Sequence, residues 1–454
     1  MKFKSIKFLP FCFILMAGLL ITGCDPNPAA DNGNDRENGD ALALTFGGSG
    51  EDVGNSIIQT ADGGFLIVGS TTSDDGDFDG LAIGNDDIFA LKLNSSRETE
   101  WIKTFGGSGS DRAYSAIEDV GGNFVITGST NSNDGTFAGQ NRGSSDIFLI
   151  KISPEGGLIW VRIFGGSGED HGNAIIQAPN NNYIIAGSTR STDFNFFQRS
   201  NNSRDAFLLA TDINGQPNWV LPFGGTDNDD AFDLAISLGN TIVATGTFES
   251  RDGSFFATEP GNAGIFVHET DLSGRTIALS TYGGEGTDIA NSITLLNDGS
   301  FAIAGRSNSN TGLFDGLNHG NFDAFLLRLN FNLTVNQMTT FGGSSFDEAH
   351  AVIQTSGGNL LVAGETDSGD HDFDDLHSGQ TDLFLALFDT NLQPIWIDAY
   401  GGSDSEAALS AFQSQNGDFA LTGWTRSSDG IFDEEPKTQP DLFFLLTDSD
   451  GVIK

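Results

Sequence analysis

Short apolar runs separated by polar, glycine-rich segments recur along the chain from residue 41 onward. In the first unit, residues 55–60 lead into the turn sequence Asp62-Gly63-Gly64, and the apolar run 65–69 follows at once. A long polar segment separates this pair from an apolar run at 88–93 and an alternating run at 101–105. Asp-Gly turns between short apolar runs predict hairpins, and no run has a helical period. We therefore predict four short strands in this unit.

This unit is repeated seven times at a constant length. An aromatic-Gly-Gly triplet opens each copy, and each triplet lies 59 residues after the previous one. The triplets begin at Phe46, Phe105, Phe164, Phe223, Tyr282, Phe341 and Tyr400. Seven units of four strands predict an all-β fold, a seven-bladed β-propeller with four antiparallel strands in each blade. The second and third strands are apolar at nearly every position, which blades packed on both faces require.

The two ends of the repeat array predict how the ring closes. The last unit, from Tyr400, supplies three strands before Lys454, and its fourth strand is missing. The segment Ala41–Thr45 precedes the first triplet in the register of a fourth strand. We therefore expect this N-terminal strand to complete the last blade, so that residues 41–454 form one propeller domain.

Several repeat motifs resemble those of known proteins. Each is seen in the first unit, as Phe46-Gly47-Gly48-Ser49-Gly50-Glu51-Asp52, Gly69-Ser70-Thr71 and Asp87-Ile88-Phe89. They resemble the tandem propeller repeats of bacterial secreted and lipid-anchored proteins, over residues 41 to 454. The resemblance implies the propeller fold and a cell-envelope setting, but it implies no single activity, because that group of proteins hosts none.

The N-terminus has the pattern of a lipoprotein signal peptide. Three lysines precede an apolar stretch from Phe8 to Ile21, which ends in Leu20-Ile21-Thr22-Gly23-Cys24. This ending resembles the bacterial lipobox, which implies a signal peptide at 1–23 and acylation of Cys24, palmitate being one expected chain. An ordinary signal peptide with an incidental cysteine is the alternative. Residues 24–40 then form the lipidated cysteine and a flexible acidic tether.

The charge balance limits the partners. The chain has 62 acidic and 21 basic side chains, for a formal charge of −41. Nucleic acid is excluded as an expected partner, because no basic surface exists to displace counterions from phosphates. A hydrophobic fraction of 38% with 10% aromatic residues is too high for a disordered acidic tail. The two cysteines leave no disulfide framework.

Columns of identical residues separate scaffold from candidate site. Phenylalanine recurs at the positions of Phe78 and Phe89, and we interpret both columns as blade packing rather than a ligand cage. Acids recur at the positions of Asp52 and Asp87, and we interpret them as caps that accept backbone N–H bonds. Strand alternation places the triplet loops and the long polar loops on one face. That acidic face is where we expect a partner to bind.

Two of the long loops have the oxygen spacing of a calcium loop. The first is Asp75-Gly76-Asp77-Phe78-Asp79-Gly80, with a further acid at its twelfth position, and it resembles an EF-hand-type loop. The second copy has Asp375 in place of the turn glycine. Calcium is the one cofactor that the sequence suggests, with these candidate ligands: Asp75, Asp77, Asp79, Asp86, Asp370, Asp372 and Asp374.

One column varies in chemistry at the start of the first strand, which we expect to be the innermost. Its polar and aromatic side chains would suit a sugar or peptide site, and filling the centre of the ring is the alternative interpretation. The column contains Asn55, Tyr114, Asn173, Phe232, Asn291 and His350, and ends with Leu409.

Catalytic motifs have little support. The six histidines form no His-Glu-x-x-His pair, and no Gly-x-Ser-x-Gly elbow occurs. The segments Asp212–Trp219 and Asp389–Trp396 resemble the Trp-bearing turns of quinoprotein-type propellers, but those enzymes have eight blades. Propeller lipoproteins that scaffold outer-membrane assembly use related blades without catalysis.

The favoured interpretation is a monomeric, non-catalytic binding or scaffolding propeller. It would be lipid-anchored in the bacterial cell envelope, on the periplasmic side of the outer membrane or on the cell surface. Its ligand would be an envelope protein or a glycan on the acidic long-loop face. The alternative is an extracytoplasmic enzyme, either a polysaccharide hydrolase or lyase or a quinoprotein-like propeller, with its site on the same face.

Overall fold

The computed structural model describes residues 43–197, 203–256, 261–374, 376–432 and 439–454. The predicted signal peptide, Cys24, the tether and the residues Ala41 and Leu42 lie outside these ranges. The described residues belong to one compact unit, Asp40–Lys454. Within them, no helix has the length and apolar character needed to cross a bilayer.

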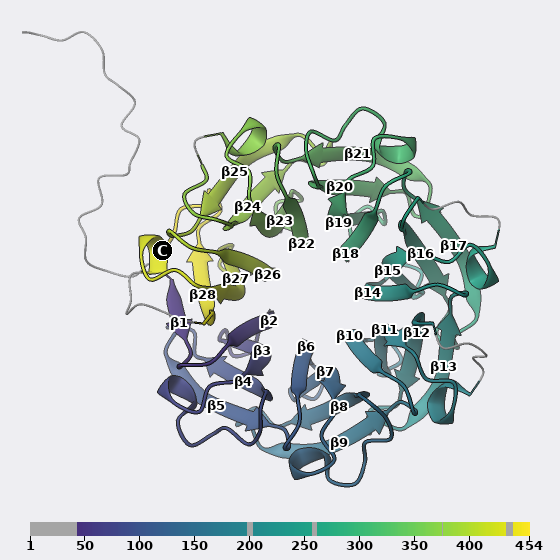
Figure 1. Ribbon diagram of the computed structural model, residues 1–454, viewed down its shortest axis with the longest axis vertical. Helices are drawn as coiled ribbons and strands as arrows, with labels where there is room; N and C mark the ends of the chain where they lie inside the picture. Colours follow the sequence, from purple (N-terminus) through teal and green to yellow (C-terminus); the bar gives the residue numbers. More distant parts are fainter. Residues whose placement is uncertain (1–42, 198–202, 257–260, 375, 433–438) are drawn as a thin grey trace, which may run out of the picture. The chain divides into compact units, whose positions relative to one another are not determined.

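The described residues form seven four-stranded antiparallel sheets arranged around a ring, which confirms the seven-bladed propeller (Figure 1). Each blade runs from an inner strand at the centre to an outer strand. The inner strands are β2 (Asp52–Gln59), β6 (Asp111–Glu118), β10 (Asp170–Gln177), β14 (Asp229–Ile236), β18 (Asp288–Leu295), β22 (Asp347–Gln354) and β26 (Glu406–Gln413). The second strands are β3 (Phe65–Thr71), β7 (Phe124–Thr130), β11 (Tyr183–Thr189), β15 (Ile242–Phe248), β19 (Phe301–Ser307), β23 (Leu360–Thr366) and β27 (Phe419–Thr425).

The two outer positions of each blade complete the sheets. The third strands are β4 (Asp87–Leu93), β8 (Asp146–Ile152), β12 (Asp205–Thr211), β16 (Gly264–Thr270), β20 (Asp323–Leu329), β24 (Asp382–Phe388) and β28 (Asp441–Thr447). The outermost strands are β5 (Thr99–Phe105), β9 (Leu158–Phe164), β13 (Pro217–Phe223), β17 (Thr276–Tyr282), β21 (Val335–Phe341), β25 (Pro394–Tyr400) and β1 (Leu44–Phe46). The first inner strand starts at Asp52, three residues before the predicted start, because the capping acid itself pairs with Thr71.

The ring is closed by the N-terminal strand, as predicted. Strand β1 pairs antiparallel with β28, with Leu44 opposite Phe444 and Phe46 opposite Leu442. The last blade therefore takes its outer strand from the beginning of the chain and its other three strands from the end.

Every inner strand contains a β-bulge at the same place. The pairing of β2 with β3 passes from Gly54 to Ser56, so Asn55 has no partner in the ladder, and the other six inner strands repeat this shift. A bulge re-aims a side chain and bends the strand locally. The variable column seen in the sequence is therefore the column of bulged residues.

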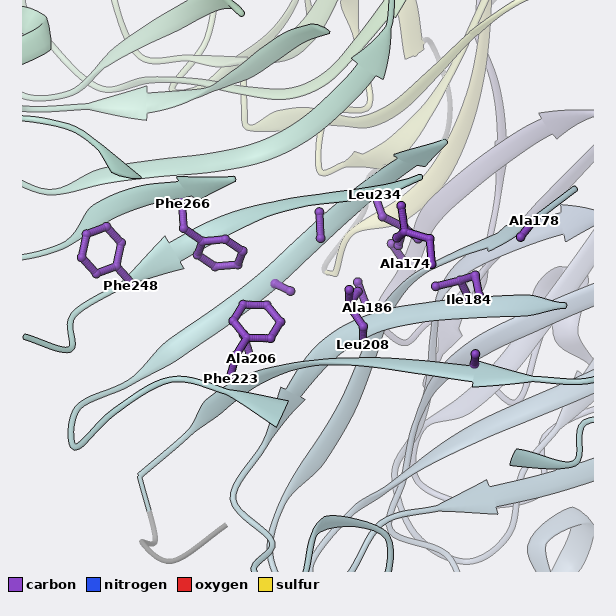
Figure 2. Packing of buried hydrophobic residues seen from close by; sticks show 14 of the residues in the cluster. Ala174, Ala178, Ile184, Ala186, Ala206, Leu208, Phe223, Leu234, Phe248 and Phe266 are labelled. Carbon is purple, nitrogen blue, oxygen red and sulfur yellow. The ribbon is translucent and has the colours of Figure 1, made fainter. Parts of the chain in front are cut away.

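The hydrophobic core lies between neighbouring blades. In one cluster, Ile184 and Leu208 of the third blade pack with Leu234 and Phe266 of the fourth (Figure 2). The Phe78 and Phe89 columns are buried, and these two rings lie 5.6 Å apart between centroids. Both columns are thus blade packing.

The strand-interior glycines allow a close approach beside the bulge. A Cβ atom at Gly69 would lie 1.8 Å from the carbonyl oxygen of Val53, which no side chain could tolerate. On the outer strands, the indoles of Trp101 and Trp219 each donate a 3.1 Å hydrogen bond to a backbone carbonyl of the next blade, that of Pro154 and that of Leu272.

Each long loop begins with a 3-10 turn that the sequence reasoning did not anticipate. Each turn ends in the buried phenylalanine of the Phe78 column, which ties the loop to the core. The turns are η1 (Gly76–Phe78), η2 (Gly135–Phe137), η3 (Phe194–Phe196), η4 (Gly253–Phe255), η5 (Gly312–Phe314), η6 (His371–Phe373) and η7 (Gly430–Phe432).

The long loops contact the triplet loops, so both lie on one face as predicted. In the first blade, the backbone N–H of Asp77 donates a 2.9 Å bond to the carbonyl of Gly47. Five of the seven turns open with a glycine in a left-handed conformation that lies against the triplet backbone, such as Gly76 with φ +61°. The turns η3 and η6 open instead with Phe194 and His371, which also have positive φ.

Candidate functional site at the centre of the ring

The acid that opens each inner strand is a structural cap. Asp111 is fully buried and accepts hydrogen bonds from the Ser132 hydroxyl at 2.7 Å, the Gly107 N–H at 2.8 Å and the Thr130 hydroxyl. Burial raises the pKa of these acids, and the pKa of Asp229 reaches about 7. The interpretation of this column as loop caps is therefore confirmed.

The acids that open the third strands face these caps across the blade junctions. Asp146 accepts a 2.6 Å bond from the Arg142 N–H, and a Cβ atom at Gly165 would lie 2.0 Å from Asp146 Oδ1 and 2.7 Å from Asp170 Oδ2. Burial, together with the nearby charge of Asp170, raises the pKa of Asp146 to about 7. Only glycine fits between the two carboxyl groups, which accounts for the first glycine of the triplet.

The candidate calcium ligands fall into two groups. Asp75 Oδ1 accepts a 2.6 Å bond from the Ser49 N–H, and Asp77 Oδ2 accepts a 2.9 Å bond from the Gly47 N–H. In the sixth blade, Asp370 accepts a 2.7 Å bond from the Ser344 N–H, and Asp372 accepts a 3.0 Å bond from the Gly342 N–H. These four carboxylates therefore hold the triplet loop to the long loop.

The remaining calcium candidates make no such bridge. Asp79 and Asp374 are exposed at the C-terminal ends of η1 and η6. Asp86 is buried and accepts from the Ser110 hydroxyl at 2.8 Å and from the Arg112 guanidinium of the next blade. The structure thus brings Asp75 and Asp77 to one loop, while Asp86 is engaged by a neighbouring blade. Calcium at these loops stays a prediction.

Three positions per blade depart from the sevenfold repeat near the start of the inner strand. They are the second residue of that strand, the residue opposite it on the second strand, and the bulged residue. We call this set the central rim. In blade order it comprises Val53, Ser70 and Asn55; Arg112, Ser129 and Tyr114; His171, Ser188 and Asn173; Asp230, Thr247 and Phe232; Ile289, Arg306 and Asn291; Glu348, Glu365 and His350; and Ala407, Trp424 and Leu409.

The bulge asparagines join neighbouring inner strands. The side-chain amides of Asn55 and Asn173 each donate a 2.8 Å bond to a backbone carbonyl of the next blade, those of Ala113 and Ala231. The Asn291 amide donates a similar bond to the Ala349 carbonyl at 3.0 Å. The hydroxyl of Tyr114 instead lies 3.2 Å from the Ser129 hydroxyl, and the Phe232 side chain is half-buried. The six predicted ligand-binding residues therefore share one structural position, and the three asparagines among them brace the ring.

Ion pairs cross three blade junctions at the central rim. Arg112 pairs with Asp86, Arg204 pairs with Asp230 at 2.7 Å, and Arg306 pairs with Glu348. These pairs place charges of both signs around the centre of the ring. The scaffold positions next to them are repeated in every blade. The asymmetry of this rim distinguishes one sector of the ring from another.

Among the described residues, the sixth blade brings two carboxylates and a histidine together. Glu348, His350 and Glu365 each offer a ligand atom, and these atoms all lie within 4.8 Å of one another. His350 Nε2 is 3.4 Å from Glu365 Oε1. Burial lowers the pKa of His350, but its hydrogen bond with Glu365 and the charges of both glutamates outweigh burial and raise that pKa overall.

The sequence reasoning selected His350 but missed Glu348, Glu365 and Arg306. His350 lies in the variable bulged column, whereas these three residues occupy the two paired columns beside it. Both columns carry charged residues in some blades and small residues in others, and that variation was the available signal. Asp233 was also missed. Burial raises its pKa to about 6, and it accepts a 2.8 Å bond from the Ile293 N–H.

Comparison with known proteins identifies no family for this chain. No family model matches the chain. The regulatory protein FlaEY of Caulobacter vibrioides is 25% identical over 184 residues, which cover 38% of this chain and 19% of that protein. The chain thus spans about a fifth of the length of this curated relative.

Solved structures with a similar architecture include proteins of different kinds. The Pan2 WD40 domain of Neurospora crassa has a TM-score of 0.45 and 12% identity, covering 89% of this chain and 96% of its own. A puromycin hydrolase has a TM-score of 0.48 and 11% identity, over 90% and 53% of the two chains. A fungal alcohol oxidase in complex with copper has a TM-score of 0.47 and 12% identity, over 90% and 77%. These similarities concern the fold alone.

Proposed function

We propose that this protein is a lipid-anchored propeller of the bacterial envelope whose central rim binds a partner without catalysis. The partner would be an envelope protein or a glycan. The observation that supports this most directly is the contrast between two sets of positions. Capping acids, glycines and packing phenylalanines repeat around the ring, while the central rim changes its charge and shape from blade to blade.

The chemistry of the rim suits a polar ligand. Arginine, histidine, tyrosine and carboxylate side chains lie at its positions, and Arg112 and Arg306 each pair with an acid of a neighbouring blade. Such groups recognise hydroxyl, amide and charged groups on a ligand. Because the surrounding scaffold is a closed ring of packed sheets, these groups are held on rigid elements, which favours selective binding.

A comparison of rim and control variants would test this function. Wild-type protein, Tyr114→Ala and Arg112→Ser would be probed on a glycan array and in pull-downs from envelope extract. Val120→Ser is the control, because Val120 is 73% exposed on a hairpin turn far along the strand from the rim. We expect ligands that bind wild type and the control but not the rim variants. Ligands that bind all four proteins equally, or no ligand at all, would contradict the proposal.

An enzyme is the second candidate, because two carboxylates and a histidine converge in the sixth blade. A hydrolase or lyase acting on polysaccharide uses a paired acid and base. Incubation with envelope and capsular polysaccharides, followed by chromatography of the products, tests this candidate. Depolymerisation by wild type that is lost in Glu365→Gln would favour an enzyme over a binding module.

A further inference from the structure

The sixth blade is the part of the rim in which two acids stand directly opposite each other. Glu348 on β22 pairs with Glu365 on β23. In the other six rim pairs, such as Asp230 with Thr247 or Ile289 with Arg306, no more than one residue is acidic. Like charges directly opposite on neighbouring strands are destabilising. A cation between them removes that repulsion.

The bulge brings a histidine to the same place. His350 is the unpaired residue of β22, two positions after Glu348 in the chain. Its Nε2 atom lies 3.4 Å from Glu365 Oε1, and one oxygen of each glutamate lies within 4.8 Å of a ring nitrogen of His350. The three potential ligand atoms therefore lie in one cluster.

Neighbouring residues hold Glu348 in position. Its Oε1 atom accepts a 2.8 Å bond from the Asn291 amide, and its Oε2 atom accepts from the Arg306 guanidinium. Arg306 in turn lies between two aromatic rings, 5.1 Å from the centroid of Phe322 and 5.2 Å from that of Phe346. Such outer contacts orient the carboxylate that binds a metal and restrict its rotation.

We propose that Glu348, His350 and Glu365 bind a divalent transition metal ion of the zinc class. One imidazole nitrogen and two carboxylate oxygens form a donor set that suits zinc, whereas calcium prefers an all-oxygen shell. Three protein ligands leave a fourth position for water or for a group of the rim's partner. This site does not depend on the proposed binding function, since the metal can bind whether or not a partner is present.

The competing arrangement is an ion-pair network without metal. In that case a protonated His350 lies between the two glutamates, and Arg306 balances the remaining charge. Both arrangements use the same side chains, so stability measurements on variants alone do not distinguish them. Stoichiometric binding of added metal distinguishes the metal site from the ion-pair network.

Isothermal titration of the metal-free, full mature protein with ZnCl₂ tests the site. We expect one high-affinity zinc ion per chain in wild type. His350→Gln and Glu365→Gln should each weaken binding more than about tenfold, since loss of a direct ligand exceeds the effect of losing an outer contact. His171→Gln is the matched control, because His171 is also a rim histidine near an acid, Asp230, and should bind zinc like wild type.

Cobalt gives a second, spectroscopic measurement. Co²⁺ in place of Zn²⁺ should give visible absorption bands in wild type and His171→Gln, and these bands should be lost in Glu365→Gln. Circular dichroism verifies that each variant is folded. If His350→Gln does not fold, the zinc affinity of Glu365→Gln alone tests the proposal. The proposal is overturned if wild type binds no zinc at millimolar concentration. It is equally overturned if both variants bind zinc as tightly as wild type.

Discussion

The backbone N–H of Gln415 in the last blade donates a 2.9 Å hydrogen bond to the side-chain oxygen of Gln59 in the first. The same bond joins four other neighbouring pairs of blades, for example from Val120 to Gln177 at 2.9 Å. Each joins the hairpin turn of one blade to the end of the next inner strand. The junction between the last blade and the first therefore uses the same contact as four of the other blade junctions.

Gln59→Leu should lower the free energy of unfolding by about 1 kcal/mol, the usual net value of one hydrogen bond. Leucine is already accommodated at the equivalent position of the fifth blade, Leu295, so a steric cost is not expected. Urea denaturation measures the change. Gln413→Leu at an internal junction is the control and should cost the same amount. A much larger loss for Gln59→Leu would show that the closing junction is weaker than the others.

Asp111→Ala should destabilise the propeller by about 3 kcal/mol or more, because it leaves buried donors without an acceptor. The donors are the Ser132 and Thr130 hydroxyls and the Gly107 N–H. Asp134→Ala is the control, since Asp134 accepts a bond from the exposed Ser108 N–H and should cost less than about 1 kcal/mol. Thermal and urea unfolding would provide both values. Equal effects in the two variants would contradict the capping role.

Stability should fall as the pH rises from 4 to 7. Folding raises the pKa of Asp146 and Asp229 to about 7 and that of Asp347 to about 6, chiefly through burial. An acid whose pKa is raised by folding adds stability below its unfolded pKa near 4, and this contribution is lost as the pH rises through the folded value. His268, whose pKa burial lowers to about 4, opposes the trend below pH 6.5, but fewer histidines than acids are shifted.

Calorimetry at constant ionic strength tests this pH dependence. The Tm should be higher at pH 5 than at pH 7.5, and Asp146→Asn should reduce the difference. Asp389→Asn serves as the control, because hydrogen bonds lower the pKa of Asp389 and it titrates below this range. A Tm that rises between pH 5 and 7.5 would contradict the assignment.

Calcium at the two acidic loops can be tested separately from zinc. Asp75 and Asp370 already accept loop N–H bonds, so we expect weak binding, with a Kd of about 0.1–1 mM. The exposed Asp79 and Asp374 are the residues to change, because Asp79→Ala and Asp374→Ala should abolish binding without loosening the loops. Isothermal titration with CaCl₂ measures this. The absence of heat at millimolar calcium would end the hypothesis.

Cys24→Ser should release the protein from the membrane fraction. The lipobox-like sequence ending in Cys24 predicts acylation, and several acyl chains anchor a protein stably. Metabolic labelling with radioactive palmitate and cell fractionation provide the two measurements. Labelling that persists in the variant, or an unlabelled wild type, would mean that the segment is an ordinary signal peptide.

The regular features of the fold were predictable because they depend on local sequence patterns repeated at a fixed interval. Apolar runs, Asp-Gly turns and the 59-residue period were sufficient to predict seven blades, the closing strand and the buried Phe78 and Phe89 columns. The acids at the position of Asp52 in each blade were also interpreted correctly as caps. A carboxylate that is repeated in every blade indicates a role that every blade needs. These are properties of each unit by itself.

The candidate site depends on contacts between units, and spacing along one unit contains no information about them. Asp86 fits the twelfth position of a calcium loop, yet it pairs with Arg112 of the next blade. The bulge that brings His350 beside Glu365 arises from the pairing of two strands, and Arg306 reaches Glu348 from another blade. The sequence determined which residues form the scaffold. Only the packing of blade against blade decided which charged residues meet at the centre.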